Sequence, residues 1–320
     1  MDLAAIQAAA QRIAHDVIRT PTVDSPGLSE ALGVPVTAKL ELLQRTGSFK
    51  ARGAAAKLRS LDAAERAAGV VAVSGGNHGI AVAAVADSLG VKATIVMPRS
   101  APRRAVELAE RHGATVQLTA DVTEAFALSG RLRSEGLTLV HPFDDPVVVA
   151  GQGTVGLELA LDAGDLTDVL VSVGGGGLIA GVAVALRAIR PGVRIWGVET
   201  AGSDTMAQAL RAGGPVTLVP TSIVSTLSPP AVAPLTYAHA RALVDDVLVV
   251  SDADAVRGTL ELAEAAKVWT EPAAGCLVPA ARRVIERAGP GCRLGLVVCG
   301  GNATVADVLA WADRFGLDRG

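Results

Sequence analysis

Short apolar runs rich in Val, Ile and Leu alternate with Ala-rich amphipathic segments along almost the whole chain. Most of these runs are followed closely by Gly, Pro or Ser and then by a helical pattern. Parallel strands joined by crossover helices produce this alternation, because helices cover both faces of the sheet. We therefore predict an α/β fold built mostly from parallel strands. The predicted strands are residues 70–74, 92–97, 114–118, 169–173, 193–198 and 293–298.

The length of 320 residues favours two domains, because chains of this size usually divide into more than one core. Residues 64–144 contain three or four consecutive strand–helix units with tight connections, which is typical of a small doubly wound domain. Residues 1–63 and 145–320 then form a large, discontinuous domain. Each domain is expected to contain an open, twisted, mostly parallel sheet with flanking helices.

The composition argues against several partners. The net charge is −3 and only 2% of residues are aromatic, so we expect no nucleic-acid partner. No apolar stretch is long enough to span a bilayer, so we expect no membrane partner either. The first 19 residues carry charges spread through a helical pattern, which indicates an ordinary first helix and not a cleaved leader.

The three cysteines, Cys276, Cys292 and Cys299, are odd in number and have no C-x-x-C spacing. This argues against a disulfide framework and against a zinc site. We therefore expect reduced thiols and a cytoplasmic protein.

The segment from Glu41 to Gly53 is the first that carries chemistry. Ser48 is placed to cap a helix over residues 49–60, which puts Lys50 in its first turn. The partial positive charge of a helix N-terminus disfavours an ammonium, lowers the amine pKa and favours Schiff-base chemistry. The alternative is a solvated surface lysine.

The second segment, residues 74–79 (SGGNHG), lies between a predicted strand and a predicted helix. Its glycines allow a ligand to approach the backbone, and the amides of the helix start can bind an anion such as a substrate carboxylate. The alternative is a tight turn in which Asn77 caps the helix and His78 is solvated.

The third segment is the run of four glycines at residues 174–177. Four glycines cost more backbone entropy than an ordinary turn requires, and close approach to a phosphate would compensate. Because no Gly-Lys-Ser/Thr follows, the run does not match a Walker A loop.

The fourth segment is Cys299-Gly300-Gly301-Asn302, directly after the last predicted strand. Open α/β sheets bind ligands at the carboxyl ends of their strands, so Cys299 is a candidate ligand contact. The alternative is a buried thiol that acts as a small hydrophobe.

Together, the segments around Lys50, 74–79, 174–177 and 299–302 resemble, in order and approximate spacing, the serine/threonine dehydratase family of pyridoxal 5′-phosphate (PLP) enzymes. The resemblance covers nearly the whole chain. It implies fold type II, the tryptophan synthase beta-like superfamily, with PLP as cofactor and a homodimer as assembly. It also implies a dehydratase (ammonia-lyase) that converts L-serine, L-threonine or a related 3-hydroxy amino acid to a 2-oxo acid and ammonia.

The resemblance also implies roles for individual residues. The catalytic residues are Lys50, as Schiff-base lysine and base, and Ser74. The residues implied to bind the cofactor are Phe49, Lys50, Asn77, Gly174, Gly175, Gly176, Gly177, Glu271 and Cys299. The residues implied to bind the substrate are Ser74, Gly75, Asn77 and His78. Within this set, Asn77 is expected to bond the ring hydroxyl and the four glycines to cradle the phosphate.

Cys299 matches the position at which the family places a Ser, Thr or Cys against the pyridine nitrogen. A carboxylate there would keep that nitrogen protonated and stabilise a carbanion long enough for transamination or racemisation. A neutral thiol favours elimination of the β-hydroxyl. Glu199 and Glu271 also match recurring acidic positions, Glu271 near the cofactor ring. For both, a carboxylate that only complements a helix dipole remains the alternative.

Two positions depart from the family pattern. Residues 222–227 read SIVSTL where many members carry Thr-Ile-Ala-Asp-Gly-Leu, so the acid is missing. Racemases of the family commonly carry a Ser directly after the position of Ser74, where this chain has Gly75. We therefore predict a dehydratase over a racemase. We predict no metal, because no carboxylate lies between Gly213 and Asp245.

Other readings stay open. Threonine synthase-like or cysteine synthase-like enzymes perform replacement on the same fold. A non-catalytic binding module or a nucleotide-binding reductase can be built on similar sheets. Among substrates, serine, threonine, 3-hydroxyaspartate and phenylserine analogues stay open, because the segment around Ser225 is expected to line the side-chain pocket.

Overall fold

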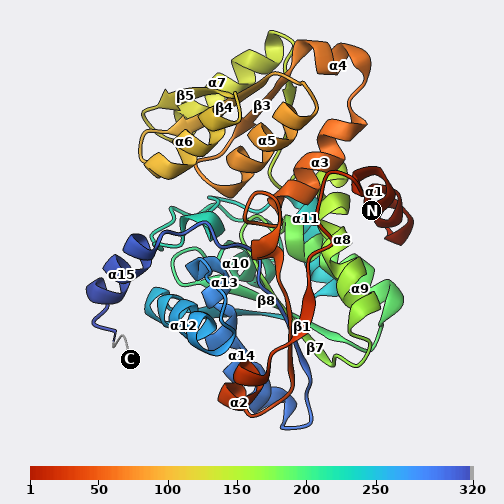
Figure 1. Cartoon of the computed structure of the whole chain (residues 1–320), viewed down its shortest axis with the longest axis vertical. Coiled ribbons are helices and arrows are strands. Elements are labelled where there is room, and N and C mark those ends of the chain that lie inside the picture. The colour runs from red at the N-terminus through yellow and green to blue at the C-terminus, as the bar shows by residue number, and fades with distance from the viewer. Residues whose placement is uncertain (318–320) are drawn as a thin grey trace.

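The computed structural model describes residues 1–317 and contains two sheets, one in each lobe of Figure 1. The lower lobe holds a six-stranded sheet in the order β1-β2-β10-β7-β8-β9. All neighbouring strands in it run parallel except β1 and β2. Its strands are β1 (Thr22–Asp24), β2 (Val36–Lys39), β7 (Asp168–Ser172), β8 (Arg194–Thr200), β9 (Asp246–Val250) and β10 (Leu294–Val297).

The upper lobe holds a four-stranded, fully parallel sheet in the order β5-β4-β3-β6. Its strands are β3 (Val70–Val73), β4 (Ala93–Pro98), β5 (Thr115–Thr119) and β6 (Thr138–Leu139). All four lie inside the predicted small domain of residues 64–144. The exact domain boundaries stay a prediction.

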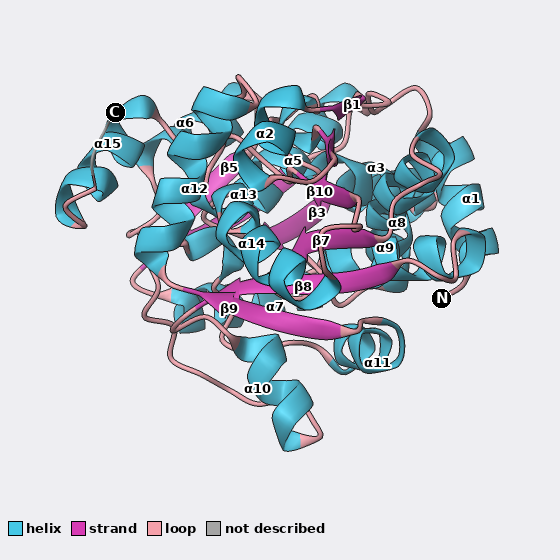
Figure 2. Cartoon of the chain, turned by 90° about the horizontal axis from the view of Figure 1, so that it is seen from below, coloured by secondary structure: helices cyan, strands magenta, loops and turns pink. Residues whose placement is uncertain are grey.

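Helices surround both sheets, as the view from below in Figure 2 shows for the larger one. The helices between residues 60 and 140 are α4 (Ala63–Ala68), α5 (Asn77–Ser88), α6 (Arg103–Arg111) and α7 (Val122–Ser134). The other helices are α1 (Leu3–Ile13), α2 (Pro26–Leu32), α3 (Lys50–Ser60), α8 (Pro146–Asp162), α9 (Gly177–Ile189), α10 (Thr205–Ala212), α11 (Pro234–Leu243), α12 (Asp252–Ala265), α13 (Pro272–Gly275), α14 (Leu277–Ala288) and α15 (Val305–Arg314). Two 3₁₀ turns are η1 (Glu41–Leu43) and η2 (Ser225–Leu227).

The predicted fold class is confirmed, since two open, mostly parallel sheets carry flanking helices. The six predicted strands all occur, with ends shifted by one or two residues. Strand β9 is absent from the prediction, although its sequence DVLVV carries a readable apolar run. It lies at the edge of the sheet and its first residues are partly exposed, so its pattern is less clearly that of a buried strand.

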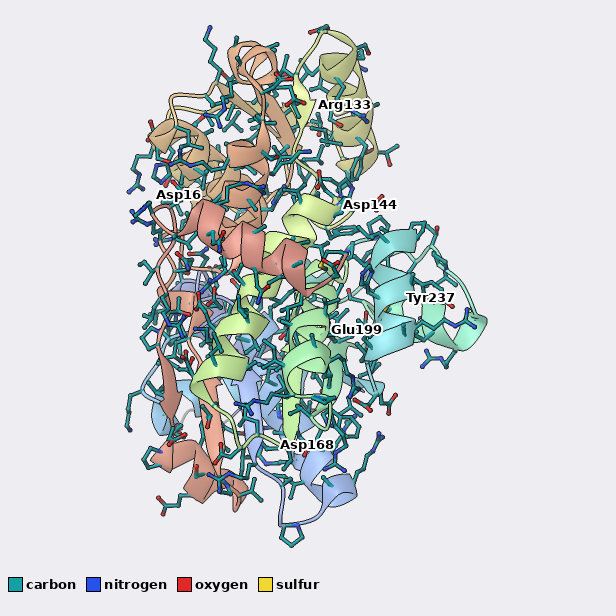
Figure 3. All side chains as sticks on the ribbon, turned by 90° about the vertical axis from the view of Figure 1, so that its right-hand side faces the viewer. Asp16, Arg133, Asp144, Asp168, Glu199 and Tyr237 are labelled. Atoms are coloured by element: carbon teal, nitrogen blue, oxygen red, sulfur yellow. The ribbon has the colours of Figure 1, made fainter. Side chains whose placement is uncertain are left out.

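The two lobes share apolar packing. One buried cluster combines side chains of α1, α3 and α8 with those of β3, β4 and α5. A separate, larger cluster fills the space around the six-stranded sheet. In Figure 3, Arg133 lies in the upper lobe, Glu199 in the lower lobe, and Asp144 at the level where the lobes meet. Loops at this junction are therefore held by packing from both lobes.

The parallel topology brings loops of interest to one region. The glycine run follows β7, Cys299 follows β10, and Ser74 follows β3. Carboxyl ends of parallel strands lie on one edge of their sheet, so the first two loops are neighbours in the lower lobe. The loop after β3 meets them from the upper lobe, which defines the candidate site.

Candidate active site

Two segments far apart in the chain meet at Lys50. The backbone amide of Phe49 donates to the carbonyl of Cys299 at 3.0 Å, and Ser48 forms an isolated bridge with Gly300. Lys50 Nζ lies 5.0 Å from the centre of the Phe49 ring and donates to the carbonyl of Pro142 at 3.2 Å. The structure therefore places the predicted lysine beside the predicted thiol.

The helix that begins at Lys50 differs from the prediction at its cap. Ser48 does not cap α3; the N-cap residue is Phe49, and no side chain bonds the free amides there. Within residues 1–317 the Ser48 hydroxyl is buried without a hydrogen-bond partner. The bridge to Gly300 turns Ser48 toward the last strand, and tertiary pairing thus overrides the local capping preference.

A buried ionic cluster anchors α3. Arg52 Nε donates to Glu41 Oε2 at 2.8 Å, and its Nη1 donates to Glu158 Oε1 at 2.7 Å. Lys39 Nζ donates to the second oxygen of Glu158 at 2.6 Å. These contacts tie α3 directly to η1 and α8, and through Glu158 to β2, so neighbouring elements hold the position of Lys50.

The environment of Lys50 suits it to covalent chemistry. Burial lowers the pKa of the Lys50 ammonium to about 8, and the nearby Cys299 and Glu271 partly oppose this shift. A neutral amine is the nucleophile in Schiff-base formation and the base in proton abstraction. Near pH 8, about half of the lysine is in that form.

The loop after β3 presents its backbone to the site. Ser74 Oγ accepts a hydrogen bond from the Gly76 amide at 3.2 Å, and α5 begins directly afterwards at Asn77. No side chain caps this helix, so its first amides are free for a ligand. The alternative in which Asn77 caps α5 does not hold, because its amide points to another element.

Asn77 is held by two residues from the other lobe. Its Nδ2 donates to both carboxylate oxygens of Glu271, at 2.9 and 3.1 Å. Its Oδ1 accepts from Nδ2 of Asn302 at 2.7 Å. Asn302 ends the segment 299–302, but the sequence predicts no role for it, because this pairing exists only in the folded chain.

Glu271 is the centre of this network. Besides Asn77, it accepts from the Thr226 hydroxyl at 3.3 Å and from the Asn302 amide at 3.3 Å. Burial raises the pKa of the Glu271 carboxyl, and the donors of Asn77, Asn302 and Thr226 oppose that shift. Thr226 lies in the segment where the family pattern has glycine, so its side chain is a contact that the motif could not indicate.

His78 is buried and neutral. Its Nε2 lies 2.8 Å from the carbonyl of Val140, and because a carbonyl only accepts, Nε2 carries the proton. Burial, with the charge of Lys50 as a further cause, lowers the pKa of His78 to about 3. Its Nδ1 has no partner among residues 1–317 and is a free acceptor. The alternative of a solvated His78 is therefore wrong.

The glycine run forms a tight loop between β7 and α9. A Cβ atom on Gly175 would lie 2.1 Å from the Phe143 ring, and Gly176 has a left-handed φ of 87°. The Thr236 hydroxyl holds the loop by donating to the Gly175 carbonyl at 2.7 Å. The loop leads into the 13-residue helix α9, whose first amides can bind an anion.

Cys299 is 3% exposed. Burial and the nearby Glu271 raise the pKa of its thiol well above the usual value, so it is a neutral thiol. It lies within the electrostatic reach of Lys50. The alternative, in which Cys299 only packs as a small apolar side chain, therefore matches this position less well.

Glu199 serves a different purpose. Its carboxylate accepts from the backbone amides of Met206 at 2.8 Å and Ala207 at 2.9 Å, in the first turn of α10. Burial raises the pKa of Glu199 to about 8, although these two amides oppose the shift. These contacts match the alternative for Glu199, in which the carboxylate complements a helix dipole.

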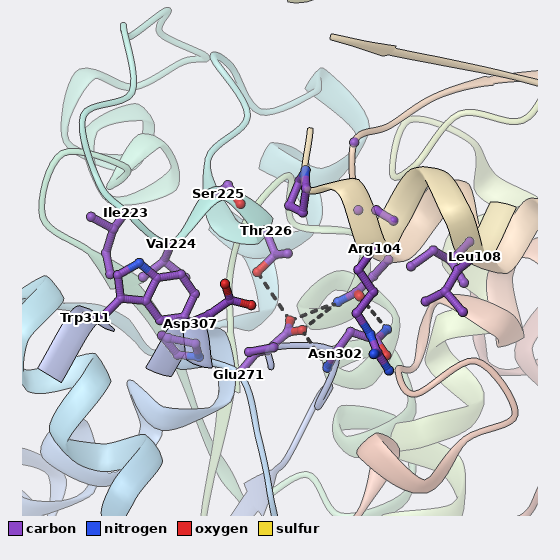
Figure 4. Close-up of a pocket in the computed structure, with 18 residues that line it drawn as sticks. Arg104, Leu108, Ile223, Val224, Ser225, Thr226, Glu271, Asn302, Asp307 and Trp311 are labelled. Carbon is purple, nitrogen blue, oxygen red and sulfur yellow. Dashed lines mark hydrogen bonds between the residues drawn. The ribbon is translucent and has the colours of Figure 1, made fainter. Parts of the chain in front are cut away.

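A cavity of about 150 Å³ adjoins the Asn77–Glu271 network (Figure 4). Its wall includes Gly75, Gly76 and residues 223–226, as expected for the segment 222–227 that departs from the family pattern. Side chains of α6 and α15 also line it. The prediction included nothing from α6 or α15, because neither carries a motif.

Two kinds of feature are not found in residues 1–317. None of the helices there combines the length and apolarity needed to cross a bilayer. No group of three or more His, Cys, Asp and Glu side chains in this part of the chain has an arrangement that could hold a metal ion.

Comparisons with known proteins extend these observations. Residues 13–300 match the family model described as "Pyridoxal-phosphate dependent enzyme". An L-threonine ammonia-lyase of Geobacter sulfurreducens is 39% identical over 97% of this chain and 77% of its own. A phenylserine dehydratase of Ralstonia pickettii is 38% identical over 99% of this chain and 97% of its own.

The fold is matched as closely. The structure of maize serine racemase superposes with a TM-score of 0.91 at 34% identity, over 98% of this chain and 97% of that one. The similarity to this structure thus covers nearly all of both chains, and the proteins compared include an ammonia-lyase, a dehydratase and a racemase.

Proposed function

The chain belongs to the family of pyridoxal-phosphate dependent enzymes, and we propose that it is a dehydratase of 3-hydroxy amino acids. It would convert L-serine, L-threonine or a related substrate to a 2-oxo acid and ammonia, as a carbon–nitrogen lyase. One observation carries this proposal, namely the buried backbone pairing of the Lys50 segment with Cys299, which brings a neutral thiol close to the lysine.

The residues present fit PLP. The Lys50 amine can bond the cofactor's aldehyde, and the glycine loop presents only backbone, because side chains at residues 175 and 176 would collide with Phe143, Met206 and Thr236. The buried Ser48 hydroxyl and His78 Nδ1 lack partners in the described chain, as expected of polar groups that face a ligand. When bound, PLP supplies an electron sink for the charge left by the departing α-proton.

In this proposal, Lys50 moves protons at Nζ. Its pKa of about 8 makes the neutral amine available near physiological pH, so it can accept a proton from the substrate's Cα. The contacts of Arg52 hold the helix of Lys50 in place, which limits the reorganisation needed for that transfer.

The loop after β3 would bind the substrate's carboxylate. Ser74, Gly75, Asn77 and His78 lie where the free amides of α5 begin, which favours an anion. Because His78 stays neutral, the helix amides and not an imidazolium meet the charge of the carboxylate. Ser74 is the hydroxyl nearest to these amides in sequence and is proposed to act with Lys50 in catalysis.

Cys299 would face the pyridine nitrogen as a neutral group. A thiol whose pKa is raised well above the usual value supplies no negative charge there. The charge left at Cα is then less stabilised, so prompt loss of the β-hydroxyl is favoured over reprotonation. Asn77 and Glu271 would lie beside the ring, where their mutual hydrogen bonds orient them.

Racemase activity is the alternative, because a serine racemase has a similar fold. A racemase needs a second proton-transfer group on the opposite face, and Gly75 has no side chain to serve as one. A dehydratase is therefore favoured. Replacement chemistry like that of threonine synthase or cysteine synthase is the other alternative within the fold.

The test is a product assay on the holoenzyme. L-threonine should yield 2-oxobutanoate and ammonia in equal amounts, and recovered L-serine should keep its chirality. Lys50→Ala should lose the visible absorbance of the bound cofactor, whereas Lys57→Ala, on the same helix, should keep it. Rapid interconversion of serine enantiomers, or incorporation of added sulfide into product, would contradict the proposal.

Two further properties follow from the family resemblance and the composition. We propose a cytoplasmic location, because all three cysteines are free and buried. We also propose a homodimer, which light scattering of the purified protein tests directly.

A further inference from the structure

The cavity next to Asn77 and Glu271 adjoins the proposed cofactor position on one side and extends away from it. Lys50, Cys299 and the glycine run contribute nothing to its wall, whereas Gly75, Asn77 and Glu271 do. A substrate whose carboxylate lies at the loop after β3 would therefore direct its side chain into this space. The nature of the wall then decides which side chain fits.

The cavity volume of about 150 Å³ is large for a methyl group. An apolar cavity of about this size in another protein binds benzene. The methyl group of threonine would leave most of this volume without contacts, and unfilled volume forfeits binding energy. A phenyl ring matches the volume.

The wall is mainly apolar and comes from both lobes. Ile80 and Ala105 of the upper lobe are buried, and Leu108 lies on the same helix as Ala105. Figure 4 shows Trp311 and Ile223 on one side of the cavity and Leu108 on the other. Aromatic and aliphatic walls on opposite sides suit a flat, apolar ring.

The charged groups of the wall do not favour an acidic side chain. Glu271 already accepts hydrogen bonds from three residues, and Asp307 accepts two from Thr304 in a helix cap. Both are carboxylates and would repel a second one. Arg104 is exposed at the rim, where solvent screens its charge.

We infer that this enzyme prefers 3-hydroxy amino acids with an aromatic or bulky apolar side chain, of which phenylserine is the type, over serine and threonine. The inference rests on the proposed function and names its substrate class. Trp311 and Leu108 are the side chains that set the preference. The missing acid of residues 222–227 agrees with this preference, because Ser225 adds no charge to the part of the wall that this segment forms.

The first measurement compares kcat/KM of the holoenzyme for L-phenylserine, L-threonine and L-threo-3-hydroxyaspartate. Phenylserine should exceed threonine by about 10- to 100-fold, since burying a ring in place of a methyl group is worth that much in discrimination. A second measurement uses calorimetry with L-phenylalanine and L-2-aminobutyrate, which lack the leaving hydroxyl. Phenylalanine should bind more tightly by about tenfold or more.

Variants test which side chains set the substrate preference. Trp311→Ala should lower kcat/KM for phenylserine by about tenfold and leave threonine within about twofold. Val305→Ala is the matched control, because Val305 lies on the same helix, is 56% exposed and contributes nothing to the cavity wall. Val305→Ala should change kcat/KM for neither phenylserine nor threonine.

Two results would overturn the inference while the proposed function stands. One is threonine turnover equal to or faster than phenylserine turnover. The other is preferred turnover of 3-hydroxyaspartate that is lost in Arg104→Ala. If no substrate yields a 2-oxo acid, the proposed function fails. In that case, the comparison of phenylalanine binding with 2-aminobutyrate binding still decides whether the cavity prefers an aromatic side chain.

Discussion

Asn77 and Glu271 are 194 residues apart in the chain, yet the Asn77 amide donates to both carboxylate oxygens of Glu271 at 2.9 and 3.1 Å. Asn77 begins a helix of the upper lobe, and Glu271 lies in the lower lobe just before α13. The pair therefore joins the two lobes at the candidate site. The Glu271 carboxylate also accepts from Thr226 and Asn302, so its removal takes a partner from three residues at once.

Glu271→Ala should lower both stability and activity. The variant leaves the buried donors of Asn77 unpaired, which should reduce the free energy of unfolding by about 1–3 kcal/mol. The loss of orientation at Asn77 should also lower kcat/KM. Urea denaturation and a product assay measure the two effects. Glu264→Ala, at an exposed position of α12, is the control and should change stability by less than about 0.5 kcal/mol. Equal behaviour of the two variants would refute the role of the network.

The pKa of Lys50 predicts a pH dependence of stability in cofactor-free protein. Its folded pKa of about 8 lies below the ordinary value of 10.5, so between these values the unfolded chain binds more protons than the folded one. Stability of the wild type should therefore rise with pH across this window, relative to Lys50→Met, by up to about 3 kcal/mol. Denaturation of both proteins at pH 7, 9 and 10.5 measures the difference. If the difference in the free energy of unfolding between wild type and Lys50→Met stays constant with pH, the pKa of Lys50 is not lowered by burial.

Gly75→Ser should introduce racemase activity. The variant adds a hydroxyl to the loop after β3, on a Cβ that would lie 3.0 Å from the Ala101 Cβ, a close contact that needs a small shift of Ala101. We expect slow interconversion of serine enantiomers, measured by chiral chromatography, together with retained dehydration. Gly75→Ala tests the Cβ without the hydroxyl and should show no interconversion. If both variants behave alike, the hydroxyl is not positioned to transfer a proton.

Arg52→Ala should be strongly destabilising. Arg52 is fully buried between Glu41 and Glu158, and its removal leaves carboxylates buried with less compensation. The expected loss is about 3–5 kcal/mol in the free energy of unfolding. Arg103→Ala removes an exposed ion pair with Glu107 and should cost no more than about 1 kcal/mol. Thermal and urea denaturation of the two variants decide whether burial sets the cost.

Much of the fold was predictable because its signals are local. The strands at 70–74 and 169–173 are short apolar runs followed by glycine, and both are strands in the structure within one residue. Strand β1 was not predicted, because its three residues, Thr22–Asp24, are too few to show a period. It exists through antiparallel pairing with β2, which is a contact between segments.

The candidate site also divides into features that the sequence predicts and features that only the tertiary structure decides. The sequence by itself determined which residue types follow which strands: Lys50, the loop from Ser74, the glycine run and Cys299. Only the tertiary structure decided that Ser48 leaves its helix uncapped, that Glu271 binds Asn77, and that Trp311 faces Leu108 across a cavity. The reason is physical. Turns, strands and helix starts depend on neighbours within a few residues, whereas burial, shifted pKa values and cavity shape depend on which distant segments the packing brings together.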